Sequence, residues 1–172
     1  MIASARLRDP NFAQTVVLIV QHDAAGALGL VLNRPLETTV QEACSELLDH
    51  SVEADGVLHQ GGPCEGLLMV VHTQSDIGEV EILPGVFFTA DRTKIEWLLA
   101  NVGSDIRYFV GYSGWGAGQL EAEVSTGSWV IEAAGKPTVF SDDPKQWSKL
   151  AARATVGRYV DPDRIPDDAS LN

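Results

Sequence analysis

The sequence contains few of the features that assign a chain to a specialised class of protein. Only 2 of its 172 residues are cysteines, Cys44 and Cys64. They are too few and too far apart for a metal site, so we expect no metal and no cofactor, and two reduced, buried thiols. The longest aliphatic run, Val16–Val20, is far too short to cross a bilayer. Met1–Arg6 lacks a basic segment followed by an apolar one, so we expect no signal peptide and, by elimination, a cytoplasmic location without membrane association.

Basic residues are scarce as well. The chain has 12 Lys and Arg against 24 Asp and Glu, which gives a formal net charge of −12 at pH 7. Binding to a nucleic-acid duplex usually needs clustered basic side chains that displace counterions, and no basic run occurs. Direct nucleic-acid binding is therefore disfavoured, and it would require a contiguous basic face on the folded protein. Strong acidity also favours solubility and repels anionic membranes.

What remains is the composition of an ordinary globular domain, with 45% hydrophobic and 21% charged residues. The length is sufficient for one domain with a substantial core. We assign residues 1–158 to that domain and residues 159–172, which carry several aspartates, to a flexible acidic tail. Strands and helices are interspersed without strict alternation, so the sequence predicts an α+β fold with a mixed sheet.

Several segments have recognisable starts and stops. The run from Thr39 to Glu42 is a capping box that opens a helix to about residue 49. Asp91 is expected to cap a second helix through residue 102, and Asp143 with Pro144 to open the last one. Strands are expected at residues 2–5, 15–21, 27–32, 57–59, 67–72, 80–83, 86–89, 106–110, 129–132 and 138–140, with a four-residue hairpin loop at 23–26 and a stop at Pro35.

The segment from Gly111 to Glu121, GYSGWGAGQLE, is the most informative part of the chain. It places four glycines around Trp115 directly after an apolar strand. Glycine allows positive φ or a very close approach, and tryptophan buries a large area while its N–H needs a partner. The spacing matches neither a dinucleotide loop, which would need glycine at position 119, nor a nucleophile elbow, which would need glycine at position 115. We therefore expect a sharp turn of the strand here.

Other polar residues give weaker signals. His22 and His72 each end a strong strand, and the commonest role of such histidines is a structural hydrogen bond. Arg34 has the chemistry to bind an anion bidentately, although a salt bridge is its ordinary role in an acidic chain. Glu121 and Glu123 are two positions apart, so on a helix they diverge and make a poor acid and base pair.

Several of these pieces together resemble one protein family. The segments that carry the resemblance are DPNF at 9–12, QHD at 21–23, GALGLVLNRP at 26–35, GGP at 61–63 and the glycine-rich segment at 111–121. They are similar, in order and over nearly the whole chain, to the YqgE/AlgH family, also called UPF0301. The family often has Glu where Gln21 stands, which weakens any mechanism that uses a carboxylate there.

The resemblance implies a compact domain whose mostly antiparallel sheet is bent into a partial barrel flanked by helices. It implies a bacterial protein without an established biochemical activity. Some family members carry the name of a transcriptional regulator of alginate production. Because this chain is so acidic, we expect any regulation to act through a protein partner.

We therefore expect a non-enzymatic binding or regulatory module whose partner is an unknown protein or small molecule. In the candidate groove, Arg34 would bind an anionic group of the ligand, Trp115 would stack on the ligand, and the remaining residues would supply hydrogen bonds. The alternative is a hydrolase-type enzyme that uses a strand-end histidine as general base. The candidate groove consists of His22, Asn33, Arg34, His72, Tyr112, Trp115 and Gln119.

Overall fold

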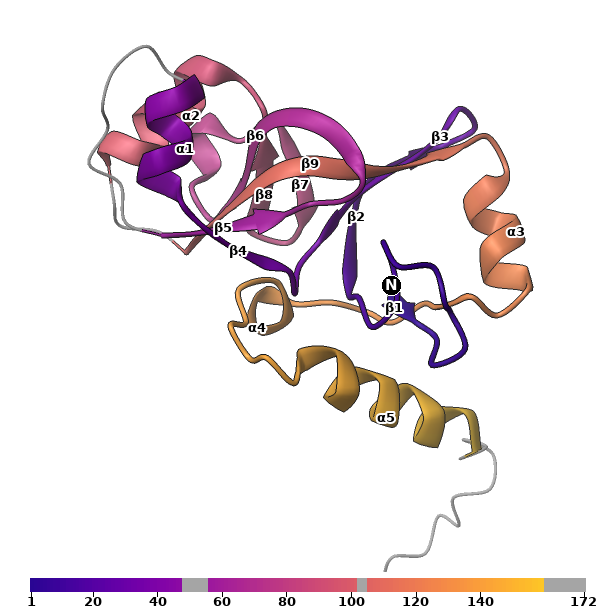
Figure 1. Cartoon of the computed structure of the whole chain (residues 1–172). Coiled ribbons are helices and arrows are strands. Elements are labelled where there is room, and N and C mark those ends of the chain that lie inside the picture. Colours follow the sequence, from indigo (N-terminus) through magenta and orange to yellow (C-terminus); the bar gives the residue numbers. More distant parts are fainter. Residues whose placement is uncertain (48–55, 102–104, 160–172) are drawn as a thin grey trace, which may run out of the picture.

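The computed structural model of the chain describes residues 1–47, 56–101 and 105–159 (Figure 1). Helices and strands alternate irregularly along the chain. In order they are β1 (Ile2–Ala3), β2 (Val17–Asp23), β3 (Gly26–Val31), β4 (Pro35–Thr39), α1 (Val40–Leu47), β5 (Val57–Gln60), β6 (Cys64–His72), a 3-10 turn η1 (Ser75–Ile77), β7 (Val80–Leu83), β8 (Val86–Thr89), α2 (Arg92–Ala100), β9 (Ile106–Gly116), α3 (Gln119–Ser125), β10 (Trp129–Val130), α4 (Lys136–Val139) and α5 (Gln146–Tyr159).

The described strands form a large mixed sheet around β9. Its main path runs β2-β3-β9-β6-β8-β7, and β5, with β4 at its outer edge, is also paired to β9. The β5–β9 pair is parallel, and the other pairs are antiparallel. The sheet curls until β2 lies against β7. The expected α+β fold with a mostly antiparallel sheet bent into a partial barrel is therefore confirmed.

The helices flank this sheet at different places. Helices α1 and α2 lie together at one end, and α3 lies at the other end, beyond the β3 hairpin (Figure 1). A small second sheet joins β1 to β10 in antiparallel register. Helix α5 lies beside β1, and the Trp147 indole donates a hydrogen bond to the Ala3 carbonyl at 2.8 Å. The C-terminal helices thus close the side of the molecule on which β1 lies.

Buried apolar side chains form three clusters. One lies between α1, α2 and the sheet around Val70 and Leu98. A second fills the curled sheet around Phe109 and Val139. The third lies under α3 and contains Trp115 and Trp129. Since α4 and α5 contribute to the second cluster through Val139 and partly buried side chains, the C-terminal segment belongs to the core.

Of the three predicted helix starts, those at Thr39 and Asp91 are confirmed, whereas the last helix, α5, begins at Gln146, two residues after Pro144. The Thr39 Oγ1 accepts from the Glu42 backbone N–H at 3.2 Å, and the Thr39 backbone N–H donates to the Glu42 carboxylate at 2.8 Å. This reciprocal pair satisfies two donors that the helix start leaves free. The Asp91 Oδ1 accepts from the Lys94 backbone N–H at 3.0 Å and caps α2.

Two local expectations are wrong, and one strand is additional to those predicted. The strand stop before Pro35 is confirmed, because β3 ends at Val31, but Pro35 opens a further strand, β4, at an edge position that tolerates the missing N–H. Residues 138–140 are not a strand, because Pro137 lies in the first turn of helix α4, a position that proline favours. The 23–26 loop is shorter than expected, since Asp23 and Gly26 pair with each other and only residues 24 and 25 turn.

The glycine-rich segment continues the strand instead of turning it, so the expected corner is also wrong. Gly111 has a φ of 70° and sits inside β9, opposite a bulge of β6. A Cβ at Gly61 would lie 2.2 Å from the Gly111 carbonyl oxygen, and one at Gly62 would lie 2.3 Å from that of Tyr112. Glycine is therefore required where the β5–β6 connection crosses β9.

Some expectations fall outside the described residues. They concern residues 48–49 and 102 of the first two predicted helices, and residues 160–172 of the predicted tail. The division into a domain at 1–158 and a tail at 159–172 accordingly stays a prediction.

Candidate functional site

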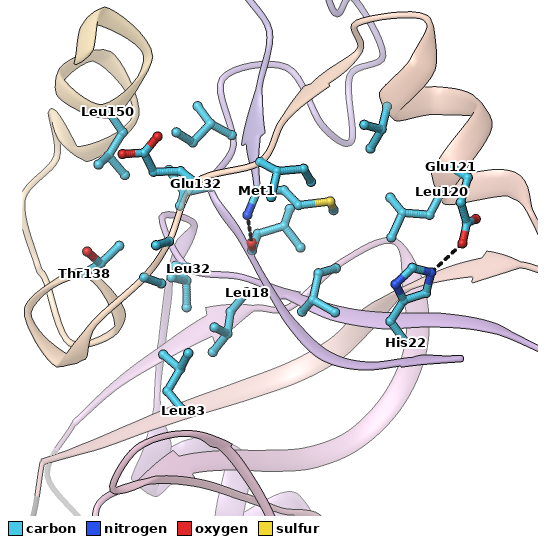
Figure 2. A pocket seen from close by; sticks show the side chains of 18 of the residues that line it. Met1, Leu18, His22, Leu32, Leu83, Leu120, Glu121, Glu132, Thr138 and Leu150 are labelled. Carbon is cyan, nitrogen blue, oxygen red and sulfur yellow. Dashed lines mark hydrogen bonds and ion pairs between the residues drawn. The ribbon is translucent and has the colours of Figure 1, made fainter. Parts of the chain in front are cut away.

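A large cavity lies between β2, α3 and the segment that follows β10 (Figure 2). Its volume is about 700 Å³. Most of the lining is aliphatic and comes from segments far apart in the sequence. The lining residues are Met1, Ile2, Val16, Val17, Leu18, Ile19, His22, Leu32, Leu83, Leu120, Glu121, Val124, Ser125, Ile131, Glu132, Ala133, Ala134, Thr138 and Leu150.

Strand alternation and helix periodicity explain this lining. Leu18 of β2 and Val16, which precedes the strand, point toward the second core cluster, whereas Val17 and Ile19 of β2 point toward the third. The cavity lies where the two clusters meet. Leu120 and Val124 are four residues apart on α3 and therefore share the helix face that covers the third cluster.

His22 and Glu121 form the polar pair at one end of the cavity. The His22 Nε2 lies 2.7 Å from the Glu121 Oε1, and both side chains are partly exposed (Figure 2). A hydrogen bond from the backbone N–H of Glu121 and then the one from His22 lower the pKa of this carboxyl. The carboxylate therefore stays ionised at neutral pH and holds the imidazole against the cavity rim.

The opposite part of the cavity carries a second polar set. The Met1 amino group donates to the Val17 carbonyl at 2.6 Å, and its burial lowers the amino pKa to about 6, a shift that Glu132 opposes. Glu132 also pairs with Arg153 of α5 at 2.7 Å. The carboxylates Glu121 and Glu132 thus give the rim an excess of acidic groups over an apolar interior.

Trp115 and Gln119 meet at Glu123, away from His22. The Trp115 and Trp129 indoles donate to the Glu123 Oε2 at 3.0 and 2.8 Å, and the Gln119 amide donates to Oε1 at 2.9 Å. Burial opposes ionisation of Glu123, but these hydrogen bonds outweigh it and lower its pKa. Trp115 is 5% exposed and stacks on Phe12 with a centroid separation of 5.7 Å. Its ring is therefore a core group and is closed to a ligand in this structure.

Asn33 and Arg34 hold the loop that precedes β2. The Asn33 Oδ1 accepts from the Val16 backbone N–H at 2.8 Å, and its amide donates to the Gln14 carbonyl at 2.9 Å. The Arg34 guanidinium donates to the Pro10 carbonyl at 2.9 Å. This arrangement supports Gln14, a non-glycine residue with a φ of 59°. The two side chains already have a structural role.

His72 lies in the core at the end of β6. It is 0% exposed, and its Nδ1 accepts from the Gln74 backbone N–H at 3.2 Å. Within the described part of the chain its buried Nε2 has no hydrogen-bond partner. Burial lowers the pKa of His72 and keeps the ring neutral. Tyr112, in contrast, is half-buried on β9 opposite Cys64 and packs against the second cluster.

The structure therefore distributes the seven candidate residues over several places. His22 is the member of the set that lines the large cavity. Trp115 and Gln119 come together at Glu123, and Asn33 and Arg34 come together at the loop before β2. His72 and Tyr112 lie elsewhere. Whether any of the seven binds a ligand, and whether they form one groove, stays a prediction.

A polar cluster that the sequence analysis missed is centred on Arg107 of β9. The guanidinium is 5% exposed and donates to the Val139 carbonyl at 2.7 Å, to His59 Nε2 at 2.9 Å and to Asp142 at 3.0 Å. Burial and then the neighbouring Arg107 charge lower the pKa of His59. Burial also lowers the pKa of Arg107, which Asp142 opposes. The sequence contained one signal of this cluster, because Arg107 stands at an inward position of an otherwise apolar predicted strand.

The described residues lack two features that would point to particular classes of protein. No cluster of three or more His, Cys, Asp or Glu side chains has an arrangement that would hold a metal ion. In the same residues, no helix combines the length and apolar character needed to cross a bilayer.

Comparisons with known proteins give a consistent result. A UPF0301 protein of Chlorobaculum tepidum is 39% identical over 180 residues, which cover 100% of this chain and 93% of that protein. One of Streptomyces coelicolor is 34% identical over 189 residues, with the same coverage of 100% and 93%. The solution structure of the Pseudomonas aeruginosa AlgH protein superposes with a TM-score of 0.72 at 29% identity, covering 99% of this chain and 93% of that one.

A crystal structure from Corynebacterium diphtheriae, at 21% identity, shares the fold with a TM-score of 0.67 over 88% of this chain and 83% of that one. Residues 1–158 match the family described as AlgH-like. The resemblance seen in the sequence is therefore confirmed, and the chain belongs to the AlgH-like family of UPF0301 proteins.

Proposed function

We propose that this protein is a non-enzymatic binding module whose large cavity takes a small, mainly apolar ligand. The observation that supports this most is the cavity of about 700 Å³. Its volume lies in the range of small-molecule sites, roughly 300–1,000 Å³, which are mostly apolar with a few placed polar groups. The aliphatic lining with His22 and Glu121 at one end has this character.

The charge of the rim narrows the ligand class. Glu121 and Glu132 line the cavity and are its carboxylates. A ligand carboxylate near them would meet like charges, which is unfavourable in a partly buried site. A neutral or cationic hydrogen-bond donor would instead find an acceptor there. The ligand we propose is therefore an apolar molecule with an amine or hydroxyl group at one end.

A cytoplasmic, regulatory setting is part of the same proposal. Cys44 and Cys64 are both free thiols, as is usual in a reducing compartment. If the module regulates transcription, we propose that it does so through a protein partner, because its net charge of −12 disfavours contact with DNA.

A hydrolase that uses a strand-end histidine has one supporting observation, the pair of His22 and Glu121 at the cavity. A general base must also reach the group that it deprotonates. Among the described residues, no hydroxyl or thiol is hydrogen-bonded to His22, and the nearby cavity residue Ser125 donates its hydroxyl to the Ala122 carbonyl at 2.8 Å. The binding module is therefore the function we propose.

Titration with 1-aminoanthracene, a fluorescent and mainly apolar amine, tests this proposal. Ile19→Trp and Ala133→Trp each place a large ring at the cavity, from β2 and from the exposed segment after β10. Leu67→Trp is the matched control, because Leu67 is 74% exposed and lies outside the cavity.

We expect saturable binding to the native chain, at least about tenfold weaker binding to either cavity variant, and unchanged binding to the control. Ala133 is exposed, so its variant should fold even if Ile19→Trp does not. Absence of saturable binding, or equal binding by all three variants, would contradict the proposal.

A further inference from the structure

A second cavity is lined in part by β1 and differs in character from the first. Its volume is about 500 Å³, and it lies between the turn after β1 and the segment that joins α3 to β10. Its lining comes from Ile2, Ala3, Ser4, Ala5, Arg6, Leu7, Arg8, Thr126, Gly127, Ser128, Val130 and Ala151. Apart from the shared Ile2, its lining residues are distinct from those of the large cavity.

The charged lining residues of this cavity are two arginines. Arg6 and Arg8 are both exposed, and neither forms an ion pair or hydrogen bond with the rest of the described chain. Arg107 and Arg153, in comparison, are each paired with a carboxylate. The chain as a whole has a net charge of −12, whereas the lining of this cavity is positively charged because of these two guanidiniums. An anion is the ligand that such a wall attracts.

The local backbone explains why both arginines lie on the same wall. The Leu7 backbone N–H donates to the Ser4 carbonyl at 3.0 Å and closes a turn. Leu7 is half-buried and packs against the cluster of Trp115 and Trp129. Because Leu7 is anchored inward, its two neighbours Arg6 and Arg8 remain at the surface of the turn.

Hydroxyl groups line the rest of the polar wall. Thr126 and Ser128 lie on the facing segment, with their hydroxyl oxygens 3.3 Å apart. The Ser4 Oγ is buried and has no hydrogen-bond partner in the described part of the chain. Guanidinium and hydroxyl donors together match the several acceptor oxygens of a phosphate, and arginine suits phosphate oxygens better than lysine does.

We propose that this cavity binds a small phosphate monoester. Arg6 and Arg8 pair with the phosphate oxygens, and the hydroxyls of Ser4 and Ser128 donate to them. The aliphatic lining residues, such as Ala5 and Val130, cover the organic part of the ligand. The volume of about 500 Å³ admits a single small molecule and suits a phosphate monoester better than an extended nucleic-acid strand.

Backbone NMR of the full chain with phenyl phosphate as the probe tests this site. The titration is run at constant pH and constant ionic strength, balanced with sodium chloride, so that general screening is held fixed. The test variants are Arg6→Gln and Arg8→Gln, singly and together. Arg92→Gln is the matched control, because Arg92 is an exposed arginine on α2, far along the chain from the cavity.

We expect saturable shift changes at the amides of Arg6, Arg8 and Ser128, and at least about a tenfold loss of affinity in the double variant, with no loss in Arg92→Gln. Both arginines are exposed, so the variants should keep the native spectrum elsewhere. Absence of saturation, equal affinity in the double variant, or shifts confined to another surface would overturn the proposal. Binding of an oligothymidine without binding of phenyl phosphate would also overturn it. Arg6 and Arg8 do not line the large cavity, so these variants should still bind 1-aminoanthracene. The two proposals can therefore fail independently.

Discussion

Glu123 is a single carboxylate that serves three side-chain donors. Both indole N–H groups of the third cluster end on its Oε2, and the Gln119 amide ends on Oε1. The sequence indicates that the Trp115 N–H needs a partner, but we expected the ring to stack on a ligand, whereas in the structure it is buried. The acceptor was not predictable, because the carboxylate comes from α3 and the second indole from β10. The expected divergence of Glu121 and Glu123 is confirmed, since one meets His22 and the other meets the tryptophans.

Replacement of Glu123 by alanine should destabilise the protein strongly. Two largely buried indole N–H groups would lose their acceptor, and an unsatisfied buried donor costs roughly 1–3 kcal/mol. We expect the free energy of unfolding in urea to fall by at least about 2 kcal/mol. Glu121→Ala is the matched control on the same helix and should leave the unfolding midpoint nearly unchanged, because its bond to His22 is exposed. Equal losses in the two variants would contradict this role of Glu123.

At the scale of elements, β9 organises the fold. It pairs with β3, β5 and β6, so the segments before and after it in the chain meet on one strand. Its glycines let the Gly61–Gly62 connection pass at close range. Such crossings depend on contacts between segments that are distant in the sequence. Local propensity does not report these contacts, so the glycines were interpreted as a sharp turn, whereas β9 continues through them to Gly116.

Gly62→Ala should test this close crossing. Its Cβ would lie 2.3 Å from the backbone carbonyl oxygen of Tyr112, and a backbone atom has little room to move. Overpacking of this kind costs roughly 1–3 kcal/mol, so we expect a loss of at least about 2 kcal/mol in thermal or urea unfolding. Gly116→Ala on β9 is the control, because its Cβ would meet only the flexible Gln119 side chain at 3.9 Å. A Gly62→Ala variant as stable as Gly116→Ala would contradict the crossing.

Elements with strong local signals were predictable from the sequence. The capping box at Thr39, the Asp91 cap and the two strands at 80–83 and 86–89 agree with the structure. The site was less predictable, because histidines that look alike in sequence differ in burial. His22 is exposed at a cavity, whereas His72 is 0% exposed. Residues such as Arg107 gain their partners only when the C-terminal segment folds back onto the sheet.

At the scale of the whole molecule, Arg107 joins the sheet to the C-terminal helices. Its guanidinium donates a hydrogen bond to the Val139 carbonyl at the end of α4 and another to His59 of β5, and so links both elements to β9. The His59 Nδ1 lies 3.1 Å from the Val57 carbonyl, so this nitrogen carries the ring proton and Nε2 accepts from Arg107. Protonation of Nε2 would place two cations in contact. The link therefore depends on a neutral His59.

The stability of the protein should consequently depend on pH. Burial and the Arg107 charge lower the pKa of His59 below its ordinary value of 6.5, and burial does the same for His72. At these two histidines the unfolded chain therefore binds protons at a higher pH than the folded chain does. Their contribution to stability is complete above about pH 6.5 and is lost as the pH falls through the lower folded pKa values. We expect urea midpoints to fall between about pH 7.5 and about pH 5.5, and less so in His59→Gln. Parallel pH profiles for the two proteins would contradict the role of His59.

The most direct test of the proposed function is the location of a ligand in the large cavity. Intermolecular nuclear Overhauser effects between 1-aminoanthracene and the methyl groups of the full chain supply it. We predict contacts from the probe to the methyl groups of Leu18, Leu120 and Val124, which line the cavity. Contacts confined to exposed methyl groups such as those of Leu67 and Val57, or no contacts at saturation, would contradict the account.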